Sequence, residues 1–389
     1  MPDLLDPSEA IERLIGAVDA VATRELDLAE AAGRVLAEPA MADRDQPPCD
    51  TSAMDGYAVR VGDSGTLPVA AESWPGLAPP SMPVGSVVRI FTGAPVPTEA
   101  EAVVKREETD EHGERVTLSQ PITAGQHIRR RGENVKAGSL AMPAGHPITG
   151  VSAATLASFG VRRPVVYRRV RVAVLVTGDE LVDDPSPHQI RDSNGPALAA
   201  MLGRAAWLDV LPIVHVLDDL TALTGAIAEA LEQADAVLLT GGVSMGDRDH
   251  TPAAVEANGG RTLYHKLRMR PGKPNLGAVT SAGQLVLGLP GNPMSVLVGA
   301  RLLAAPGLRR LAGFAEPREK AAHVEVQGDD ATLRMWWYRP CRLDAAGLAV
   351  PTRSLGSGDP VGPAASDGFL EQPPGDLASG TRRFFPWTL

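Results

Sequence analysis

The chain has 389 residues, of which 44 % are hydrophobic and 22 % are charged, and its net charge is −10. This composition is that of an ordinary globular protein with apolar material for more than one core. The acidic balance argues against general nucleic-acid binding, which needs a basic face. Two distant cysteines, Cys49 and Cys341, argue against a disulfide framework or a cysteine-rich zinc site.

No membrane segment is expected. No apolar run approaches the roughly 18 residues that a membrane helix needs. The first residues, MPDLLDPSEAIERLIG, are acidic where a secretory signal would be basic. We therefore expect a cytoplasmic protein with no membrane partner and no nucleic-acid partner.

The first part of the chain predicts helices on either side of a β-rich domain. Helically spaced apolar residues between Ser8 and Ala20 predict one helix, and a second is predicted over Leu28–Leu36. From residue 46 to 138, short β-type runs alternate with turns. A helix returns at Val151–Ser158 and can pack back on the N-terminal helices. The predicted β-type runs are Val84–Phe91, Ala102–Arg106 and Arg115–Leu118.

Strands and helices alternate between Arg169 and about Gly313. Such alternation with short links predicts a parallel, doubly wound sheet. Asp218 or Asp219 is expected to cap the helix that follows them. Short strands and Gly-Pro turns beyond Pro317 predict a small β domain. The strands predicted for the sheet are Val170–Val176, Leu208–Val216, Ala236–Leu239 and Leu285–Gly288, and further helices are predicted to start at Ser193 or Asn194 and at Thr251.

The loops after three of these strands combine glycine with hydroxyl and carboxyl groups. They read TGDEL, TGGVSMGDRD and LPGNP. Ligands of doubly wound sheets bind outside the carboxyl ends of the strands, and glycine lets backbone N–H groups approach a phosphate. We expect Glu180, Asp218 and Asp249 to converge there and to hold Mg²⁺ together with a substrate phosphate. For Asp218, helix capping is an equally good interpretation.

A cationic segment, HKLRMRPGKP, begins at His265. Strand alternation would place Lys266, Arg268 and Arg270 on one face, where a row of like charges needs an anion to offset it. The alternative is an exposed edge strand that carries charge. The PGKP turn favours the ligand-binding interpretation.

A serine-hydrolase motif also occurs by pattern, because Gly242-Val243-Ser244-Met245-Gly246 fits GxSxG and follows a predicted strand. A serine esterase also needs an oxyanion loop and an Asp–His pair downstream. The chain has no HGGG-type loop, and neither His265 nor His323 lies in a recognisable context. The esterase interpretation is therefore disfavoured.

Several motifs in a fixed order resemble one family, the molybdopterin molybdotransferases (MoeA), which include the gephyrin E domain. The match extends from about Leu28 to Gly313. One departure is Asn134, since many members have Asp there, and its side chain lacks the charge on which a metal or molybdate role would depend. The matching motifs are PCDTSAMDGYA from Pro48, FTGAPVP from Phe91, IRRRGEN from Ile128, and then TGDEL, TGGVSMGDRD, MRPGKP and LPGNP.

The resemblance implies a multidomain α/β fold. Its parts are a split N-terminal helical domain (1–45 and 139–168), a β-rich domain (46–138), a three-layer α/β domain with a parallel-rich sheet (169–316) and a C-terminal β-barrel (317–389). It also implies a homodimer whose active site is shared between subunits, and the pathway's adenylyltransferase as a further partner.

The resemblance also implies the chemistry. The substrates would be adenylylated molybdopterin and molybdate, and Mg²⁺-dependent cleavage of the pyrophosphate link would release AMP and leave molybdenum on the dithiolene. The motif positions that match catalytic and metal-binding acids are Asp55, Glu180, Asp218 and Asp249. The predicted ligand-binding residues are Thr92, Thr177, Gly241, Gly242, Ser244, Lys266, Arg270, Lys273, Pro290 and Pro293.

Two alternatives share the same α/β domain. A molybdopterin adenylyltransferase would carry TGGTG where this chain has TGGVS, and it would lack the other domains. A non-catalytic molybdopterin-binding scaffold would not need the acids at 55, 180, 218 and 249, because clustered acids are costly to bury. The transferase is therefore the favoured prediction.

Overall fold

The computed structural model describes residues 4–243, 249–377 and 379–389. The chain forms two compact units. The first comprises Met1–Glu38, Ala144–Ala153 and Arg163–Leu389, and the second comprises Pro39–Pro143 and Ala154–Arg162. Within the described ranges, no helix has the length and apolar character needed to cross a membrane. The four-domain division stays a prediction.

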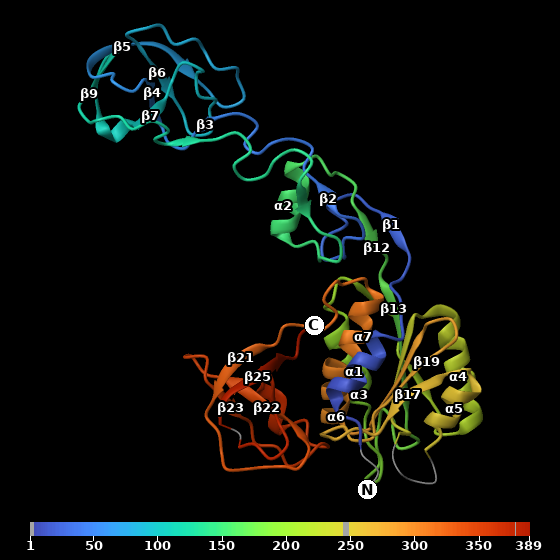
Figure 1. Ribbon diagram of the computed structural model, residues 1–389. Helices are drawn as coiled ribbons and strands as arrows, with labels where there is room; N and C mark the ends of the chain where they lie inside the picture. The colour runs from blue at the N-terminus through green and yellow to red at the C-terminus, as the bar shows by residue number, and fades with distance from the viewer. Residues whose placement is uncertain (1–3, 244–248, 378) are drawn as a thin grey trace. The chain divides into compact units, whose positions relative to one another are not determined.

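A seven-stranded mixed sheet lies at the centre of the first unit (Figure 1). Strand β13 pairs in parallel with β14, β15 and β16, and β16 pairs in parallel with β20. These four pairings confirm the parallel-rich prediction. Strand β19 is antiparallel to both of its neighbours, so an entirely parallel sheet is wrong. The link at 280–284 between β19 and β20 is too short for a parallel crossover. Across the sheet, the strands are β14 (Leu208–Val210) and β15 (Val214–Val216), then β13 (Val170–Thr177), β16 (Ala236–Thr240), β20 (Leu285–Leu289), β19 (Leu276–Val279) and β17 (Arg261–His265).

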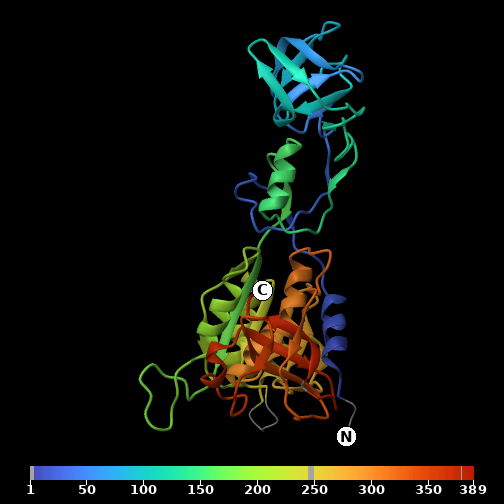
Figure 2. The same ribbon diagram turned by 90° about the vertical axis from the view of Figure 1, so that its left-hand side faces the viewer.

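Helices cover both faces of this sheet, as Figures 1 and 2 show. Strand β13 is apolar on both faces, so its alternate residues can enter two separate cores. Val172 and Val174 pack in the core that holds α1, α3, α6 and α7, whereas Ala173 and Leu175 pack against α4 and α5. The helices are α1 (Pro7–Ile15), α3 (Asn194–Leu202), α4 (Leu220–Gln233), α5 (Thr251–Ala257), α6 (Pro293–Gly299) and α7 (Ala305–Leu311), with the π-helix η2 (Ala300–Ala304) between the last two.

Three predicted elements differ in the structure. Helix α1 ends at Ile15, since Gly16 takes the C-cap position. The helix predicted over Leu28–Leu36 is wrong, because Gly33 and Leu36 donate backbone hydrogen bonds to residues 148 and 146 and the segment forms turns. The strand predicted over Leu208–Val216 is interrupted at Pro212, which has no N–H for the ladder.

The second unit contains a six-stranded sheet with an apolar core on each side, which confirms the β-rich prediction. Tyr57 and Val59 enter one core, and Ala58 enters the other. The sheet order is β7 (Ala102–Lys105), β4 (Gly56–Val59), β6 (Val87–Ile90), β5 (Gly65–Ser73), β9 (Arg115–Leu118) and β8 (Thr109–His112), with the 3₁₀ turn η1 at Arg106–Glu108. Two-stranded pairs join β3 (Thr51–Ser52) to β10 (Ile128–Arg129) and β2 (Ala40–Met41) to β11 (Leu140–Met142).

The C-terminal strands close into the predicted barrel. Five strands form a ring, because β22 pairs with both β23 and β24. Strand β18 (Met269–Arg270), which lies between β17 and β19 in the chain, belongs to this sheet and pairs in parallel with β22. The barrel strands are β21 (Ala322–Val326), β22 (Trp336–Leu343), β23 (Ala349–Pro351), β24 (Gly368–Gln372) and β25 (Gly380–Pro386), with the 3₁₀ turn η3 at Gly362–Ala365. The remaining elements lie outside these three sheets. They are β1 (Thr23–Glu25), which pairs with β12 (Val165–Tyr167), and α2 (Gly150–Ser158).

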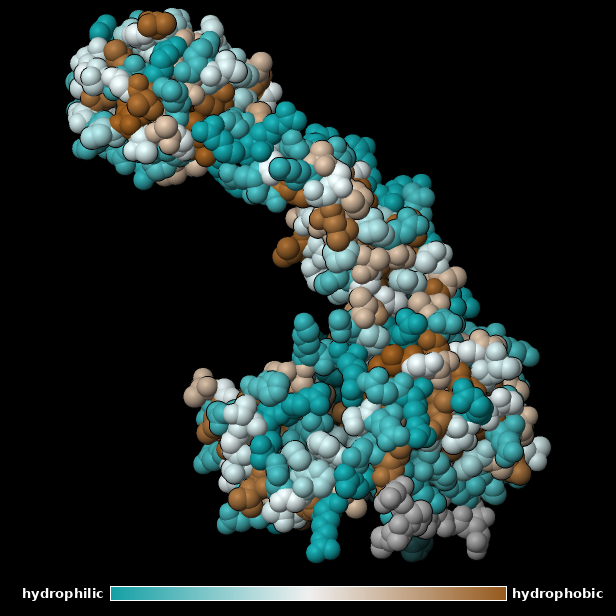
Figure 3. Space-filling view, viewed as in Figure 1, coloured by the Kyte–Doolittle hydropathy of each residue, from teal (hydrophilic) through white to brown (hydrophobic). Residues whose placement is uncertain are grey.

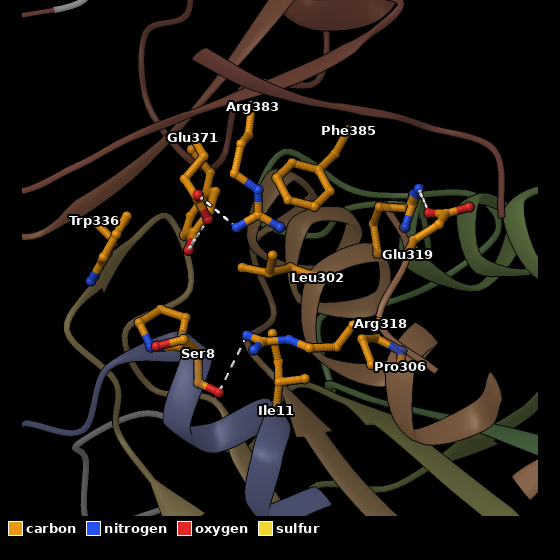
Figure 4. Close-up of a pocket in the computed structure, with 13 residues that line it drawn as sticks. Ser8, Ile11, Leu302, Pro306, Arg318, Glu319, Trp336, Glu371, Arg383 and Phe385 are labelled. Carbon is orange, nitrogen blue, oxygen red and sulfur yellow. Dashed lines mark hydrogen bonds and ion pairs between the residues drawn. The ribbon is translucent and has the colours of Figure 1, made fainter. Parts of the chain in front are cut away.

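A buried arginine joins the barrel to the α/β core. Arg301 of η2 is only 3 % exposed, and it donates to the Glu319 carboxylate and, at 2.7 Å, to the carbonyl of Pro386. A cavity of about 60 Å³ lies at this junction (Figure 4), where Arg383 donates to Glu371 at 2.9 Å. These contacts fix the barrel against the helices that carry the LPGNP loop.

Candidate functional site

Two aspartates define the centre of the candidate site at the carboxyl edge of the parallel strands. Asp218 follows β15, and Asp249 precedes α5. The Oδ1 atoms of both are buried and have no hydrogen-bond partner in the described residues. Burial raises the pKa of Asp249 to about 6, although nearby Lys266 opposes the rise. The Asp218 carboxylate raises it further. The two acids meet around Gly242, since a Cβ there would lie 3.7 Å from Asp218 Oδ1 and 3.0 Å from the hydroxyl of Thr251, two residues beyond Asp249.

The neighbouring residue resolves the capping alternative for Asp218. Asp219 caps α4, because its carboxylate accepts hydrogen bonds of 3.0 Å from the N–H groups of residues 221 and 222. The backbone N–H of Asp218 donates to Asp179 Oδ1 at 3.1 Å. Asp179 was not among the predicted site residues, although its place in TGDEL at a strand end was the available signal. The Asp218 side chain is therefore not used as the cap.

The two glycines after β16 are required by close packing. Gly241 and Gly242 have φ of +95° and +60°. A Cβ on Gly241 would lie 2.4 Å from the Thr177 carbonyl oxygen, and a Cβ on Gly242 would lie 3.0 Å from Thr251 Oγ1 and 3.7 Å from Asp218 Oδ1. The Gly241 N–H donates to the Leu289 carbonyl at 3.1 Å, so the sheet already uses this donor.

Glu180 is not part of this cluster as the described residues show it. The Glu180 carboxylate lies against Gly178, where an added Cβ would approach its oxygens to 2.9 and 3.0 Å. Among the described residues, no group of three or more His, Cys, Asp or Glu side chains is placed to hold a metal ion. Ser244 lies outside the described residues. Thr177 is buried at the end of β13, and its hydroxyl has no partner in the described part of the chain.

The cationic segment does not present one row of charges, so the prediction from strand alternation is wrong. Lys266 has a φ of +65°, which ends β17 at His265. Arg268 pairs with Asp6 through contacts of 2.7 and 2.9 Å. Arg270 lies over the ring of Trp337, 6.0 Å from its centroid. Lys266 is instead close enough to Asp249 to lower the pKa of that carboxyl group.

A cavity of about 840 Å³ separates the PGKP turn from the barrel. Asn275 holds this turn, because its buried side-chain amide donates to the Gly272 carbonyl. The LPGNP loop is tied to the barrel by Asn292, whose amide donates to Ser357 Oγ at 3.0 Å, and Pro293 begins α6. The cavity residues include four cations and one carboxylate near the predicted Pro290, namely Arg270, Lys273, Arg339, Arg353 and Asp329.

Asp55 and Thr92 meet in the second unit. The N–H and the hydroxyl of Thr92 both donate to Asp55 Oδ1 at 2.7 Å. These hydrogen bonds hold the pKa of Asp55 below its ordinary value. In the IRRRGEN motif, Arg129 donates to Glu133 and to Asn134, each at 2.6 Å. Asn134 is therefore an acceptor for an arginine within its own loop.

Comparison with known families defines the class of protein. Residues 5–160 match the family described as the MoeA N-terminal region (domain I and II). Residues 173–310 match the family described as a probable molybdopterin binding domain. The α/β domain with its acid pair and glycine turn is thus a domain of the molybdopterin-binding kind, preceded by a MoeA-type region.

Whole-chain relatives extend this result. The molybdopterin molybdenumtransferase of Nostoc sp. is 37 % identical over 357 residues, which cover 87 % of this chain and 82 % of the relative. That of Haemophilus influenzae is 38 % identical over 301 residues, which cover 75 % and 73 %. A crystal structure of the molybdopterin biosynthesis MoeA protein from Pyrococcus horikoshii has a TM-score of 0.81 at 25 % identity and covers 98 % of both chains.

The chain belongs to the molybdopterin molybdenumtransferase (MoeA) family, transferases of molybdenum cofactor biosynthesis. This assignment confirms the resemblance found in the sequence motifs. The comparisons do not favour the adenylyltransferase or the non-catalytic scaffold, since the similarity extends through the N-terminal region and the α/β domain.

Proposed function

We propose that the chain transfers molybdenum from molybdate to adenylylated molybdopterin, with Mg²⁺-dependent release of AMP. The observation that carries the proposal is the pair Asp218 and Asp249, half-buried residues whose Oδ1 atoms are fully buried and unpaired in the described residues, beside Lys266 at the edge where doubly wound sheets bind ligands. At such a site the two carboxylates can bind a divalent cation, and the lysine can bind the phosphate that the cation accompanies.

The acid pair fits Mg²⁺ by the chemistry of its donors. Two buried carboxylate oxygens have no hydrogen-bond partner among the described residues, and hard oxygen ligands are those that Mg²⁺ prefers. With a pKa of about 6, Asp249 is ionised at neutral pH and able to bind a cation. Bound Mg²⁺ would neutralise phosphate oxygens at the pyrophosphate link. The protein's own part is to hold Asp218, Asp249 and Lys266 in place.

The large cavity suits the anionic groups of the substrates. Arg270 and Lys273 reach it from the PGKP turn, and Arg353 reaches it from the barrel. Arg339 is already paired with Asp329 at 2.6 and 2.8 Å, whereas the other three cations make no ion pair within the described part of the chain. Guanidinium and ammonium groups bind oxyanions such as phosphate and molybdate through charge-assisted hydrogen bonds.

We also propose a homodimer with an active site shared between subunits. Helix α2 supports a protein interface, because Leu156 is its only buried residue and Val151 is 80 % exposed in a helix without charge. Apolar residues also appear among polar ones on the surface in Figure 3. Exposed apolar helices are typical of interfaces between subunits. The cytoplasm as location and the pathway's adenylyltransferase as partner are proposed from the resemblance alone.

The reaction is tested with purified protein, adenylylated molybdopterin, Mg²⁺ and molybdate. AMP should appear in step with molybdenum on the pterin, and chelation of Mg²⁺ should stop both. Formation of pyrophosphate from ATP and molybdopterin would instead indicate an adenylyltransferase. For the shared site, inactive Asp55→Ala and Asp249→Ala proteins should regain activity when their subunits are mixed. Failure to complement would argue against sharing.

A further inference from the structure

The acid pair leaves several coordination positions of a divalent cation open to neutral oxygens, water and substrate. Mg²⁺ takes six oxygen ligands in near-ideal octahedral geometry. The described residues place only two carboxylates at this point, and they provide no group of three acids, histidines or cysteines for a metal. Neutral oxygens from the protein are therefore the next candidates, and three buried threonines of this region have hydroxyls without a partner in the described residues. These are Thr177, Thr240 and Thr251.

The contacts around Gly242 bring the hydroxyl of one of these threonines, Thr251, close to Asp218. Thr251, the first residue of α5, is 0 % exposed. Its methyl group faces Gly288, where an added Cβ would lie 3.2 Å away, and its hydroxyl faces Gly242, where an added Cβ would lie 3.0 Å away. The same point on Gly242 is 3.7 Å from Asp218 Oδ1. Thr177 differs, because its methyl group rather than its hydroxyl approaches that point, at 3.6 Å.

The backbone holds the Thr251 hydroxyl in this direction. Its N–H donates to the Gly242 carbonyl at 3.4 Å, and a hydrogen bond from the same N–H lowers the pKa of Asp249. Packing on Gly288 restricts the rotamer, because threonine is branched at Cβ. A buried hydroxyl with no partner destabilises a fold. A ligand that binds the hydroxyl would remove this cost.

We propose that the Thr251 hydroxyl is a third protein ligand of the divalent cation bound by Asp218 and Asp249. This inference rests on the proposed function and deepens it. A neutral hydroxyl donates a lone pair to the cation while its proton stays available to an oxygen of the substrate. Serine and threonine hydroxyls serve Mg²⁺ in the same way in phosphate-binding loops.

Metal binding by the full-length protein tests the inference without turnover. Mn²⁺ is titrated alone and followed by electron paramagnetic resonance. Thr251→Val should weaken Mn²⁺ binding at least about tenfold, as loss of a supporting group does at other metal sites. Thr251→Ser keeps the hydroxyl and should bind like the unaltered chain. Without metal, Thr251→Val should unfold at the same temperature or a higher one, because it removes an unpaired buried hydroxyl.

Thr240→Val is the matched control. Thr240 is also 0 % exposed with a partnerless hydroxyl in the described residues, but it is not among the nearest neighbours of Gly242. Its substitution should leave Mn²⁺ affinity unchanged. If Asp249→Ala loses Mn²⁺ while Thr251→Val keeps the original affinity, the inference is wrong and the acid pair remains. If the unaltered chain and Asp249→Ala bind Mn²⁺ equally, the cation site in the proposed function is wrong as well.

Discussion

The carboxylate of Asp179 accepts a hydrogen bond of 3.1 Å from the backbone N–H of Asp218, and this bond joins the loop after β13 to the loop after β15. The following residue, Asp219, is fixed as the cap of α4. Asp218 is thus held through its backbone on one side and through its neighbour on the other. Its own Oδ1 stays unpaired within the described residues and available to a ligand.

Asp179 should therefore act as a positioning residue. Asp179→Ala is expected to lower the rate of AMP release about fivefold, since one hydrogen bond contributes about 1 kcal/mol. Asp179→Asn keeps an acceptor oxygen and should restore most of the rate. Weaker apparent Mg²⁺ affinity in the alanine variant would separate positioning from general damage. Equal loss in the alanine and asparagine variants would show that the hydrogen bond is not the cause.

The raised pKa of Asp249 predicts a pH-dependent stability in metal-free protein. Its folded pKa of about 6 lies above the ordinary value of 3.8, so protonation favours the folded state. The contribution is fully present below 3.8 and is lost as the pH rises through 6. Asp249→Asn mimics the protonated form, so in EDTA its Tm should exceed that of the unaltered chain at pH 8.

Near pH 5 this difference in Tm should shrink, because Asp249 is then largely protonated in the folded chain. The groups that act on Asp249 are Lys266, His250 and Asp218, and they are the same in both proteins. Thermal unfolding at the two pH values measures the difference directly. A gap in Tm that is equal at pH 5 and pH 8 would mean that Asp249 titrates normally.

Thr92 should control the pKa and the orientation of the Asp55 carboxylate. Its hydroxyl and N–H both donate to the same carboxylate oxygen, which holds the pKa of Asp55 low. Thr92→Val removes the hydroxyl only, so the pKa of Asp55 should rise. AMP release should fall about fivefold, because the carboxylate loses one of the two hydrogen bonds that orient it. The pKa is measured by NMR titration of the carboxyl carbon. Thr92→Ser is the control, and its pKa and rate should stay near those of the unaltered chain.

The junction in Figure 4 offers a matched pair of stability variants. Arg301→Met removes the more buried of the two arginine partners of Glu319 and leaves only Arg309 at 4.0 Å, so it should lower the free energy of unfolding by about 3 kcal/mol. Arg318→Met breaks an exposed pair with Glu12 and should change it by less than about 1 kcal/mol. Chemical denaturation gives both values. Similar effects of the two substitutions would contradict the role of Arg301 in holding the barrel.

The sequence predicts the central sheet well where hydrophobic runs are long. Strands such as Val170–Thr177 and Ala236–Thr240 are apolar on both faces and are bounded by glycine or aspartate, so their type and place can be read from pattern. The antiparallel edge was missed although the link at 280–284 is short. The resemblance was needed for the closed barrel, because its strands carry weak alternation.

The details of the site depend on long-range contacts that no local pattern contains. Lys266 adopts a left-handed backbone, and Arg268 is paired with Asp6 from the other end of the chain. Either of the adjacent residues Asp218 and Asp219 could cap α4 by sequence, and only the structure shows that Asp219 accepts the helix N–H groups. Thr251 reads as an ordinary start of a helix in the sequence, and only the packing of Gly242 and Gly288 shows where its hydroxyl points.

The central claim is that Asp218, Asp249 and Lys266 act together on one phosphate-bearing ligand. The most direct measurement is AMP release from adenylylated molybdopterin by Asp249→Ala, with Asp19→Ala as a control acid whose side chain is fully exposed. The account predicts a loss of at least about a hundredfold for Asp249→Ala, as for other removed charge-stabilising groups, with folding intact and Asp19→Ala unchanged. An Asp249→Ala protein that releases AMP at the original rate would contradict it.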